Sequence, residues 1–144
     1  WRQQRRMMYE RELDVPRLVA SYALEDPALP APLAEAAALA AREFDASFNS
    51  VGLNLYRDRN DSVAPHNDRL GDLVPGQPIV LLSLGATRRM RIQHKQSKAR
   101  LELDLEPGSL LLMDYATQLH YDHGIPKEKA PVGPRISLAF RMRR

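Results

Sequence analysis

The sequence contains no cysteine, and this absence removes several classes of chemistry at once. Disulfide bonds, thiolate metal sites, iron–sulfur clusters and thiol nucleophiles are all excluded. Long apolar runs are missing as well, because runs such as Leu110–Met113 fall far short of the roughly 18 residues that a membrane span requires. Any bound metal must therefore be held by histidine, aspartate or glutamate side chains.

Neither sign of charge dominates the sequence. Its 21 lysines and arginines against 18 aspartates and glutamates give a net charge of +3, which permits a polyanionic partner without requiring one. Residues 1–8 are polar and basic and lack the apolar stretch of a secretory signal peptide. We therefore expect a cytoplasmic protein that binds no membrane, and a monomer is the default expectation for its oligomeric state.

The length of 144 residues and the hydrophobic content of 44% predict one domain with a substantial core. An alanine- and leucine-rich stretch predicts a helix over 32–46, because Pro32 suits a first helical turn and no glycine or proline follows it there. Short apolar or alternating runs between turn residues predict strands over 48–56, 78–84, 88–94, 101–105, 109–113 and 136–142.

This order of elements is typical of a mainly β fold with flanking helices, arranged as a sandwich or a closed double sheet. We expect three parts within the single domain at 1–144: a front segment at 1–31, a supporting helix segment at 32–47 and a β core at 48–142.

The stretch His66-Asn67-Asp68 carries the first chemical signal. On a strand, positions i and i+2 point to the same face, so His66 and Asp68 can reach one point in space. A second histidine would complete a set of two imidazoles and one carboxylate, which suits non-haem Fe(II). The residues alone leave the identity of that histidine open between His120 and His123, and both can equally be ordinary turn residues.

Arg135 and Arg141 form a second signal, because their even separation places both on one face of a strand. Two inward arginines in an apolar strand require anions as partners. A bound dicarboxylate would satisfy them, and so would ion pairs with carboxylates of the protein itself.

Taken in order along the chain, these motifs resemble the AlkB family of Fe(II)- and 2-oxoglutarate-dependent dioxygenases. The resemblance covers residues 48–142 and rests on Asn54-Leu55-Tyr56, His66-Asn67-Asp68, the segment from Pro78-Ile79 to Ser83-Leu84-Gly85-Ala86-Thr87-Arg88, His123-Gly124-Ile125, and Arg135 to Arg141. It implies a double-stranded β-helix, or jelly roll, with buttressing helices.

The resemblance also implies roles for individual residues. His66, Asp68 and His123 match the catalytic iron ligands, and His123 is preferred to His120 because a glycine and an apolar residue follow it. The positions that match the 2-oxoglutarate site are Asn54, Tyr56, Arg135, Ser137 and Arg141. Fe(II), 2-oxoglutarate and O2 are the implied cofactors and cosubstrates.

The implied activity is oxidative demethylation of alkylated bases in single- or double-stranded DNA or in RNA, a form of DNA repair that releases succinate, CO2 and formaldehyde. For substrate contacts we expect stacking by Tyr22 and phosphate contacts by Arg17 and Arg88. Leu70 departs from the family pattern, which places an acidic residue there for recognition of the damaged base. Asp72 lies two positions further on.

Two other functions are compatible with the sequence. The first is a 2-oxoglutarate-dependent oxygenase that acts on a protein side chain or a small molecule, which Leu70 favours. The second is a catalytically silent jelly-roll binding module, which would have no need of the complete set of histidines, aspartate and arginines described above.

Overall fold

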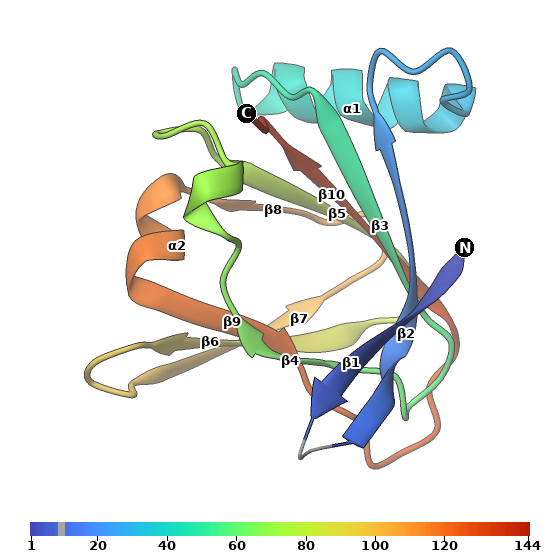
Figure 1. The fold of residues 1–144 in the computed structure, drawn as a ribbon, viewed down its shortest axis with the longest axis vertical. Helices are drawn as coiled ribbons and strands as arrows, with labels where there is room; N and C mark the ends of the chain where they lie inside the picture. Colours follow the sequence, from blue (N-terminus) through green and yellow to red (C-terminus); the bar gives the residue numbers. More distant parts are fainter. Residues whose placement is uncertain (9–10) are drawn as a thin grey trace.

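Two antiparallel β-sheets face each other in the structure, a computed structural model (Figure 1). The structure describes residues 1–8 and 11–144, and the side chains of residues 7–14 lie outside the described part. The larger sheet has the strand order β1-β2-β3-β10-β5-β8 and the smaller one the order β4-β9-β6-β7. The mainly β fold and the jelly roll expected from the sequence are confirmed.

The strands of the described chain are β1 (Arg2–Met8), β2 (Arg11–Ala23), β3 (Ser50–Tyr56), β4 (Val63–His66), β5 (Ile79–Gly85), β6 (Arg88–His94), β7 (Arg100–Leu105), β8 (Leu110–Met113), β9 (Tyr121–Ile125) and β10 (Arg135–Arg141). The helices are α1 (Ala31–Glu43), the short α2 (Tyr115–His120) and a 3-10 turn at Leu70–Asp72. The six strands expected from the sequence are β3, β5, β6, β7, β8 and β10.

The helix α1 lies on the outer face of the larger sheet, as Figure 1 shows. Its small residues Ala37 and Ala40 are buried against Leu138 and Phe140 of β10. The helix ends three residues earlier than predicted, and shortly afterwards Asp45 adopts a positive φ of 47°. Alternation along β10 turns Leu138 and Phe140 toward the helix, so the residues between them face the other sheet.

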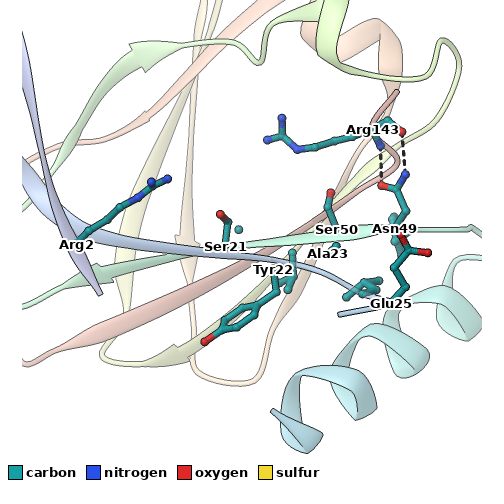
Figure 2. Close-up of a pocket in the computed structure, with 12 residues that line it drawn as sticks. Arg2, Ser21, Tyr22, Ala23, Glu25, Asn49, Ser50 and Arg143 are labelled. Atoms are coloured by element: carbon teal, nitrogen blue, oxygen red, sulfur yellow. Dashed lines mark hydrogen bonds between the residues drawn. The ribbon is translucent and has the colours of Figure 1, made fainter. Parts of the chain in front are cut away.

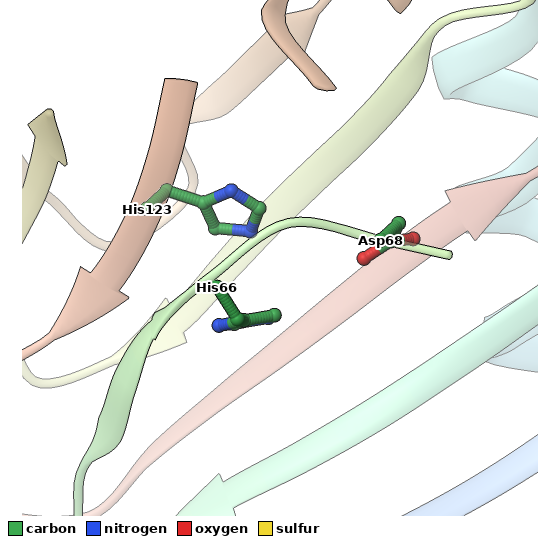
Figure 3. Close-up of side chains that lie close together, drawn as sticks. All are labelled: His66, Asp68 and His123. Atoms are coloured by element: carbon green, nitrogen blue, oxygen red, sulfur yellow. The ribbon is translucent and has the colours of Figure 1, made fainter. Parts of the chain in front are cut away.

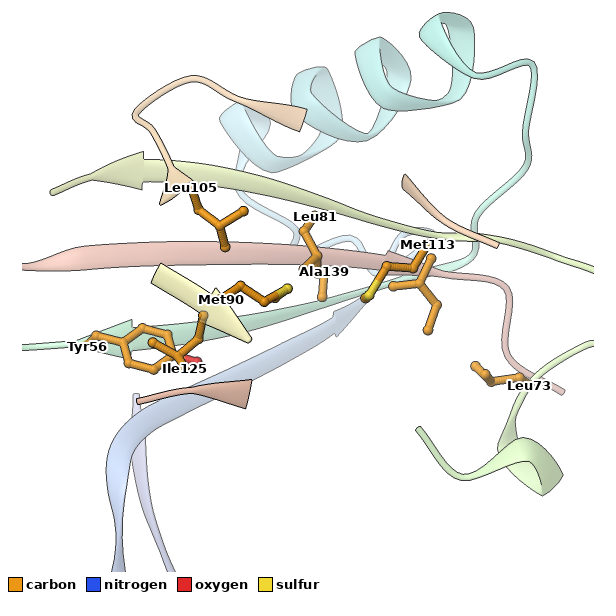
Figure 4. Close-up of a cluster of buried hydrophobic side chains, with 9 residues drawn as sticks. Tyr56, Leu73, Leu81, Met90, Leu105, Met113, Ile125 and Ala139 are labelled. Atoms are coloured by element: carbon orange, nitrogen blue, oxygen red, sulfur yellow. The ribbon is translucent and has the colours of Figure 1, made fainter. Parts of the chain in front are cut away.

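The space between the sheets is filled by a second apolar cluster (Figure 4). Leu81 and Ala139 come from the larger sheet, and Met90, Leu105 and Ile125 come from the smaller one. This cluster fixes the spacing of the two sheets, so polar residues on the inward faces of β3, β10 and β9 are held at the edge of a rigid core.

The front segment at 1–31 contributes two strands, β1 and β2. β2 pairs with β3 in the register Val19 with Asn54 and Ser21 with Gly52, and β1 pairs with β2 at the edge of the sheet. The segment therefore extends the larger sheet, and β1 and β2 form one wall of the cavity described below.

Candidate functional site

Three side chains that can ligate a metal converge where the two sheets meet (Figure 3). His66 ends β4 and is the register partner of His123 on β9, with their ring centroids 4.6 Å apart. Asp68 follows two residues after His66. One donor atom from each residue lies within 4.8 Å of the others. The pairing of β4 with β9 therefore brings together ligands that are far apart in the sequence.

The surroundings of both rings suit a metal ligand. The Nδ1 of His66 lies 2.9 Å from the carbonyl oxygen of Ala64, which can only accept, so Nδ1 is the donor and Nε2 is the nitrogen available to a metal. Burial lowers the pKa of His123 to about 4, with a further contribution from His66, so the ring is neutral at pH 7. Its buried Nδ1 has no hydrogen-bond partner among the described residues.

Asp68 is held in its charged form by an arginine. Burial alone would raise the pKa of Asp68, but Arg141 and the two histidines lower it below the ordinary carboxyl value. The guanidinium of Arg141 donates to both carboxylate oxygens, from Nε to Oδ2 and, over 3.4 Å, from Nη2 to Oδ1. Asp68 is therefore an ionised ligand at neutral pH.

A buried arginine with unused donors lies on the same sheet face. Arg135 is only 1% exposed, and its Nη2 donates to the hydroxyl of Ser83 at 2.8 Å. Its Nε and Nη1 have no hydrogen-bond partner in the described part of the chain. Its guanidinium lies 5.3 Å from the ring centre of Tyr56, a residue whose pKa is raised by burial. A buried cation with free, forked donors is suited to a carboxylate.

The remaining candidates for carboxylate binding surround this arginine. In the pairing of β3 with β10, Arg135 lies opposite Tyr56 and Ser137 lies opposite Asn54. Ser137 is buried, and the side-chain oxygen of Asn54 accepts from Nε of Arg17 at 2.8 Å. The structure thus places Asn54, Tyr56, Arg135 and Ser137 together on two neighbouring strands.

A cavity of about 850 Å³ is lined by the metal-ligand candidates His66 and Asp68, by Arg141, and by Asn54 of the group around Arg135. Asp72 lines the same cavity, whereas Leu70 is not among the described residues that line it. Asp72, two positions after the departure at Leu70, therefore borders the same cavity as the metal-ligand candidates His66 and Asp68. Among the described residues, no helix is both long and apolar enough to cross a membrane.

Known proteins match this chain across the region that builds the site. The family model described as "2OG-Fe(II) oxygenase superfamily" matches residues 9–141. The chain belongs to this superfamily. Its members use Fe(II), 2-oxoglutarate and O2.

Curated relatives place the chain near two oxygenases of the AlkB family. "DNA oxidative demethylase ALKBH2" of Homo sapiens is 37% identical over 103 residues, which is 66% of this chain and 40% of the relative. "Alpha-ketoglutarate-dependent dioxygenase alkB homolog 3" of Bos taurus is 39% identical over 104 residues, 66% of this chain and 36% of the relative. The chain thus spans about two fifths of the length of these relatives. The resemblance to the AlkB family is confirmed.

A solved structure agrees on the fold. The structure titled "The structure of OsALKBH1" superposes with a TM-score of 0.62 at 19% identity, and covers 81% of this chain and 67% of that chain.

The residues of this chain fit the groups that its superfamily binds. Two imidazoles, of which that of His123 is neutral, and an ionised carboxylate form a donor set suited to Fe(II) that leaves further coordination positions open. The free Nε and Nη1 of Arg135 are the buried donors that a carboxylate of 2-oxoglutarate would satisfy. His120 lies instead at the end of α2, stacked on His94 with ring centroids 6.5 Å apart.

One expected substrate contact is wrong. Arg88 is 1% exposed and donates to the backbone carbonyls of Asp58, Asp61 and Pro126, so it cannot reach a phosphate. The error arises because the sequence does not reveal which side of the sheet a residue faces. Arg17 does line the cavity. Tyr22 is partly buried in the apolar cluster beneath α1 and also lines a neighbouring cavity, so stacking by Tyr22 stays a prediction.

A glutamine that sequence reasoning missed supports the metal-ligand group. Gln118 on α2 is 1% exposed, and its Oε1 accepts the backbone N–H of Asp68 at 3.0 Å. Lys95 holds the end of α2 by donating from Nζ to the carbonyls of Gln118 and Leu119, at 2.9 and 3.0 Å. The sequence offers one signal for α2, because Asp114 and Thr117 have the spacing of a helix N-cap and are hydrogen-bonded at 2.8 Å.

Proposed function

We propose that this chain is an Fe(II)- and 2-oxoglutarate-dependent dioxygenase that demethylates alkylated nucleic-acid bases. One observation carries the proposal: His66, Asp68 and His123 converge as possible metal ligands, and β10 carries both Arg141, the ion-pair partner of Asp68, and a buried Arg135 with two unused donors. Structural arginines in a core normally have their donors satisfied, as those of Arg88 largely are. An oxygenase of this kind needs both a metal site and a carboxylate site, whereas a catalytically silent binding module needs neither.

In this proposal each residue has a defined task. His66, Asp68 and His123 hold Fe(II), and Arg135 binds one carboxylate of 2-oxoglutarate through its free donors, with Tyr56, Asn54 and Ser137 beside it. Arg141 orients Asp68 through its ion pair, so that a carboxylate oxygen is held toward the histidines. A further contact from Arg141 to the second carboxylate of 2-oxoglutarate stays a prediction.

The bound iron, together with 2-oxoglutarate and O2, supplies oxidation of a methyl group on a base nitrogen, with succinate, CO2 and formaldehyde as products. The protein residues bind, orient and exclude water. The neutral state of His123 keeps its lone pair available, and the apolar cluster beside Tyr56 keeps the carboxylate site dry.

A nucleic-acid substrate is supported by the charge of the cavity. Its described lining includes Arg2, Arg6, Arg17, Arg69, Arg91, Lys127, Arg141 and Arg143. A concentration of positive charge around a site attracts a polyanion. The relatives named as DNA oxidative demethylases point to the same class of substrate. Within this basic lining Asp72 supplies a negative charge, which can pair with a base made cationic by methylation.

Three expectations from the sequence stay proposals. They are a single domain at 1–144 with its β core at 48–142, a monomeric state and a cytoplasmic location.

The test is formaldehyde release from oligonucleotides that carry 1-methyladenine or 3-methylcytosine, in the presence of Fe(II), ascorbate and 2-oxoglutarate. We expect release by the wild type and none by His66→Ala or Asp68→Ala. Asp72→Asn should impair turnover of these cationic bases more than that of neutral 3-methylthymine. Succinate without formaldehyde would direct the search to a protein or small-molecule substrate, and normal turnover by His66→Ala would refute the site.

A further inference from the structure

We infer that the substrate cavity continues into a neighbouring cavity, and that Arg2 and Arg143 at the junction of the two bind the phosphodiester backbone of the strand beside the reacting base. This inference rests on the proposed function, because it names how the same substrate is held. It concerns Arg2 and Arg143, which the proposed function counts in the basic lining without giving either of them a contact of its own.

Two cavities meet along the ends of β2 and β3. The cavity at the metal-ligand group and a neighbouring cavity of about 840 Å³ are both lined by Arg2, Ser21, Gly52 and Arg143. Because these residues belong to both, the two cavities form one groove that crosses the larger sheet. We call the neighbouring cavity, with the shared residues included, the outer groove. In Figure 2 the side chains of Arg2 and Arg143 extend over the strands on which Ser21 and Ser50 lie.

The positive charge of the protein is concentrated in this groove. The described residues that line its two sections include eight basic and three acidic side chains, a net charge of +5, and of these Arg2, Arg143 and Glu25 line the outer groove. The whole chain has a net charge of only +3, so everything outside the groove is net negative. A positive field confined to one groove favours a polyanion lying along it over a partner that covers a broad face.

Arg143 is placed by its backbone, which leaves its side chain available. Its N–H donates to Oδ1 of Asn49, and its carbonyl accepts from Nδ2 of Asn49, both at 2.8 Å (Figure 2). An isolated bridge to Leu73 holds the same backbone from the other side. Substitution of the Arg143 side chain should therefore leave these contacts intact. Glu25 is the acidic residue of the outer groove and opposes its positive charge.

The occupant indicated by this chemistry is a single strand with regularly spaced phosphates. Serine hydroxyls and arginines are common phosphate ligands, and the outer groove presents Ser21 and Ser50 beside its two arginines. Tyr22 also lines the outer groove and is partly buried in the apolar cluster beneath α1.

The test is the salt dependence of binding, measured by fluorescence anisotropy with a labelled, unmethylated oligothymidylate of about 16 nucleotides. For single strands, log K falls with log salt by about 0.7 per phosphate contact, so Arg2→Ala with Arg143→Ala should flatten the slope by about 1.4. Arg143→Lys should retain most of the slope, and Glu25→Gln should strengthen binding. A slope in the double variant equal to that of the wild type would overturn the inference.

The matched control is Arg100→Ala, which removes one exposed arginine on β7, a strand of the smaller sheet. Its slope should equal that of the wild type, and an equal flattening there would mean that only net charge matters. The two proposals fail separately. If the wild type releases formaldehyde but the double variant binds normally, the outer groove is refuted and the proposed function stands. If the double variant has the flatter slope but the wild type demethylates none of the methylated bases, the outer groove stands and the proposed function is refuted.

Discussion

At the scale of the residue, the side chain that distinguishes this site from an ordinary core is Arg135. We predict that Arg135→Ala weakens 2-oxoglutarate binding by about 2–5 kcal/mol, because a desolvated charge pair loses one partner. Calorimetric titration of 2-oxoglutarate into protein loaded with Mn(II) measures this affinity without turnover. Arg89→Ala is the control, since Arg89 is half-exposed and pairs with Asp104 on the outer surface. An unchanged affinity in Arg135→Ala would make Arg135 structural.

Gln118 acts one step further from the metal. Because its Oε1 holds the backbone N–H of Asp68 at 3.0 Å, loss of this acceptor should loosen the ligand. We predict that Gln118→Leu lowers metal affinity about 10- to 100-fold, the usual effect of losing a partner that orients a ligand. Co(II) titration followed by its visible spectrum reports both affinity and ligand geometry.

Gln118→Glu supplies the control for that effect, because it keeps an oxygen in place to accept the same N–H. It should retain a larger part of the affinity than Gln118→Leu. Equal Co(II) affinity in wild type and Gln118→Leu would show that α2 packs beside Asp68 without positioning it.

At the scale of the element, the close approach of β4 and β9 depends on Gly124. A Cβ at this position would lie 2.8 Å from the carbonyl oxygen of Val63 and 3.0 Å from the nitrogen of Pro65. Both contacts are with backbone, so Gly124→Ala must push apart the strands that carry His66 and His123. We predict a loss of about 1–3 kcal/mol in the free energy of unfolding, together with weaker metal binding.

Denaturant unfolding and Co(II) titration measure the two consequences. Gly71→Ala is the matched control, because a Cβ there meets nothing within 4 Å. Wild-type behaviour of Gly124→Ala in both measurements would contradict the account of how the two strands place the ligands.

The loop between β3 and β4 should make stability depend on pH. Asp61 is 4% exposed, and burial alone would raise its pKa, but hydrogen bonds from Arg57 at 2.8 and 3.0 Å lower it below the ordinary 3.8. The unfolded chain therefore binds a proton at this carboxyl more readily than the folded one. Its stabilising contribution is present above pH 3.8 and is lost as the pH falls through the folded-state pKa.

Urea unfolding of wild type and Asp61→Asn at a series of acidic pH values checks this. The two free energies should converge as the pH falls. A constant difference between them would mean that Asp61 is not ionised in the folded state.

Elements with strong patterns were predictable, and short ones were not. The sequence predicts α1 and six of the strands because their apolar residues repeat with the period of a helix or a strand. In contrast, β4 and β9 have four and five residues, and they contain histidine, glycine and proline in place of an alternating pattern. Their pairing is set by the residues around them, so only the resemblance to a family could point to His123.

At the scale of the whole molecule, the sequence does not predict which side chains are buried and which are exposed. Arg88 stands in a basic cluster next to Arg89 in the sequence, yet the first is buried on three backbone carbonyls and the second is half-exposed. Tyr22 likewise alternates onto the helix side of its strand. The fold decides these placements through contacts between distant segments, and it also gathers the positive charge into one groove on a chain of net charge +3.

The central claim is that His66, Asp68 and His123 couple the consumption of 2-oxoglutarate to removal of a methyl group from a base. The most direct test measures succinate and formaldehyde together, in one reaction with Fe(II) and an oligonucleotide carrying 1-methyladenine. The account predicts equal amounts of both products from the wild type and neither from Asp68→Ala. Succinate without formaldehyde, or both products from Asp68→Ala, would contradict it.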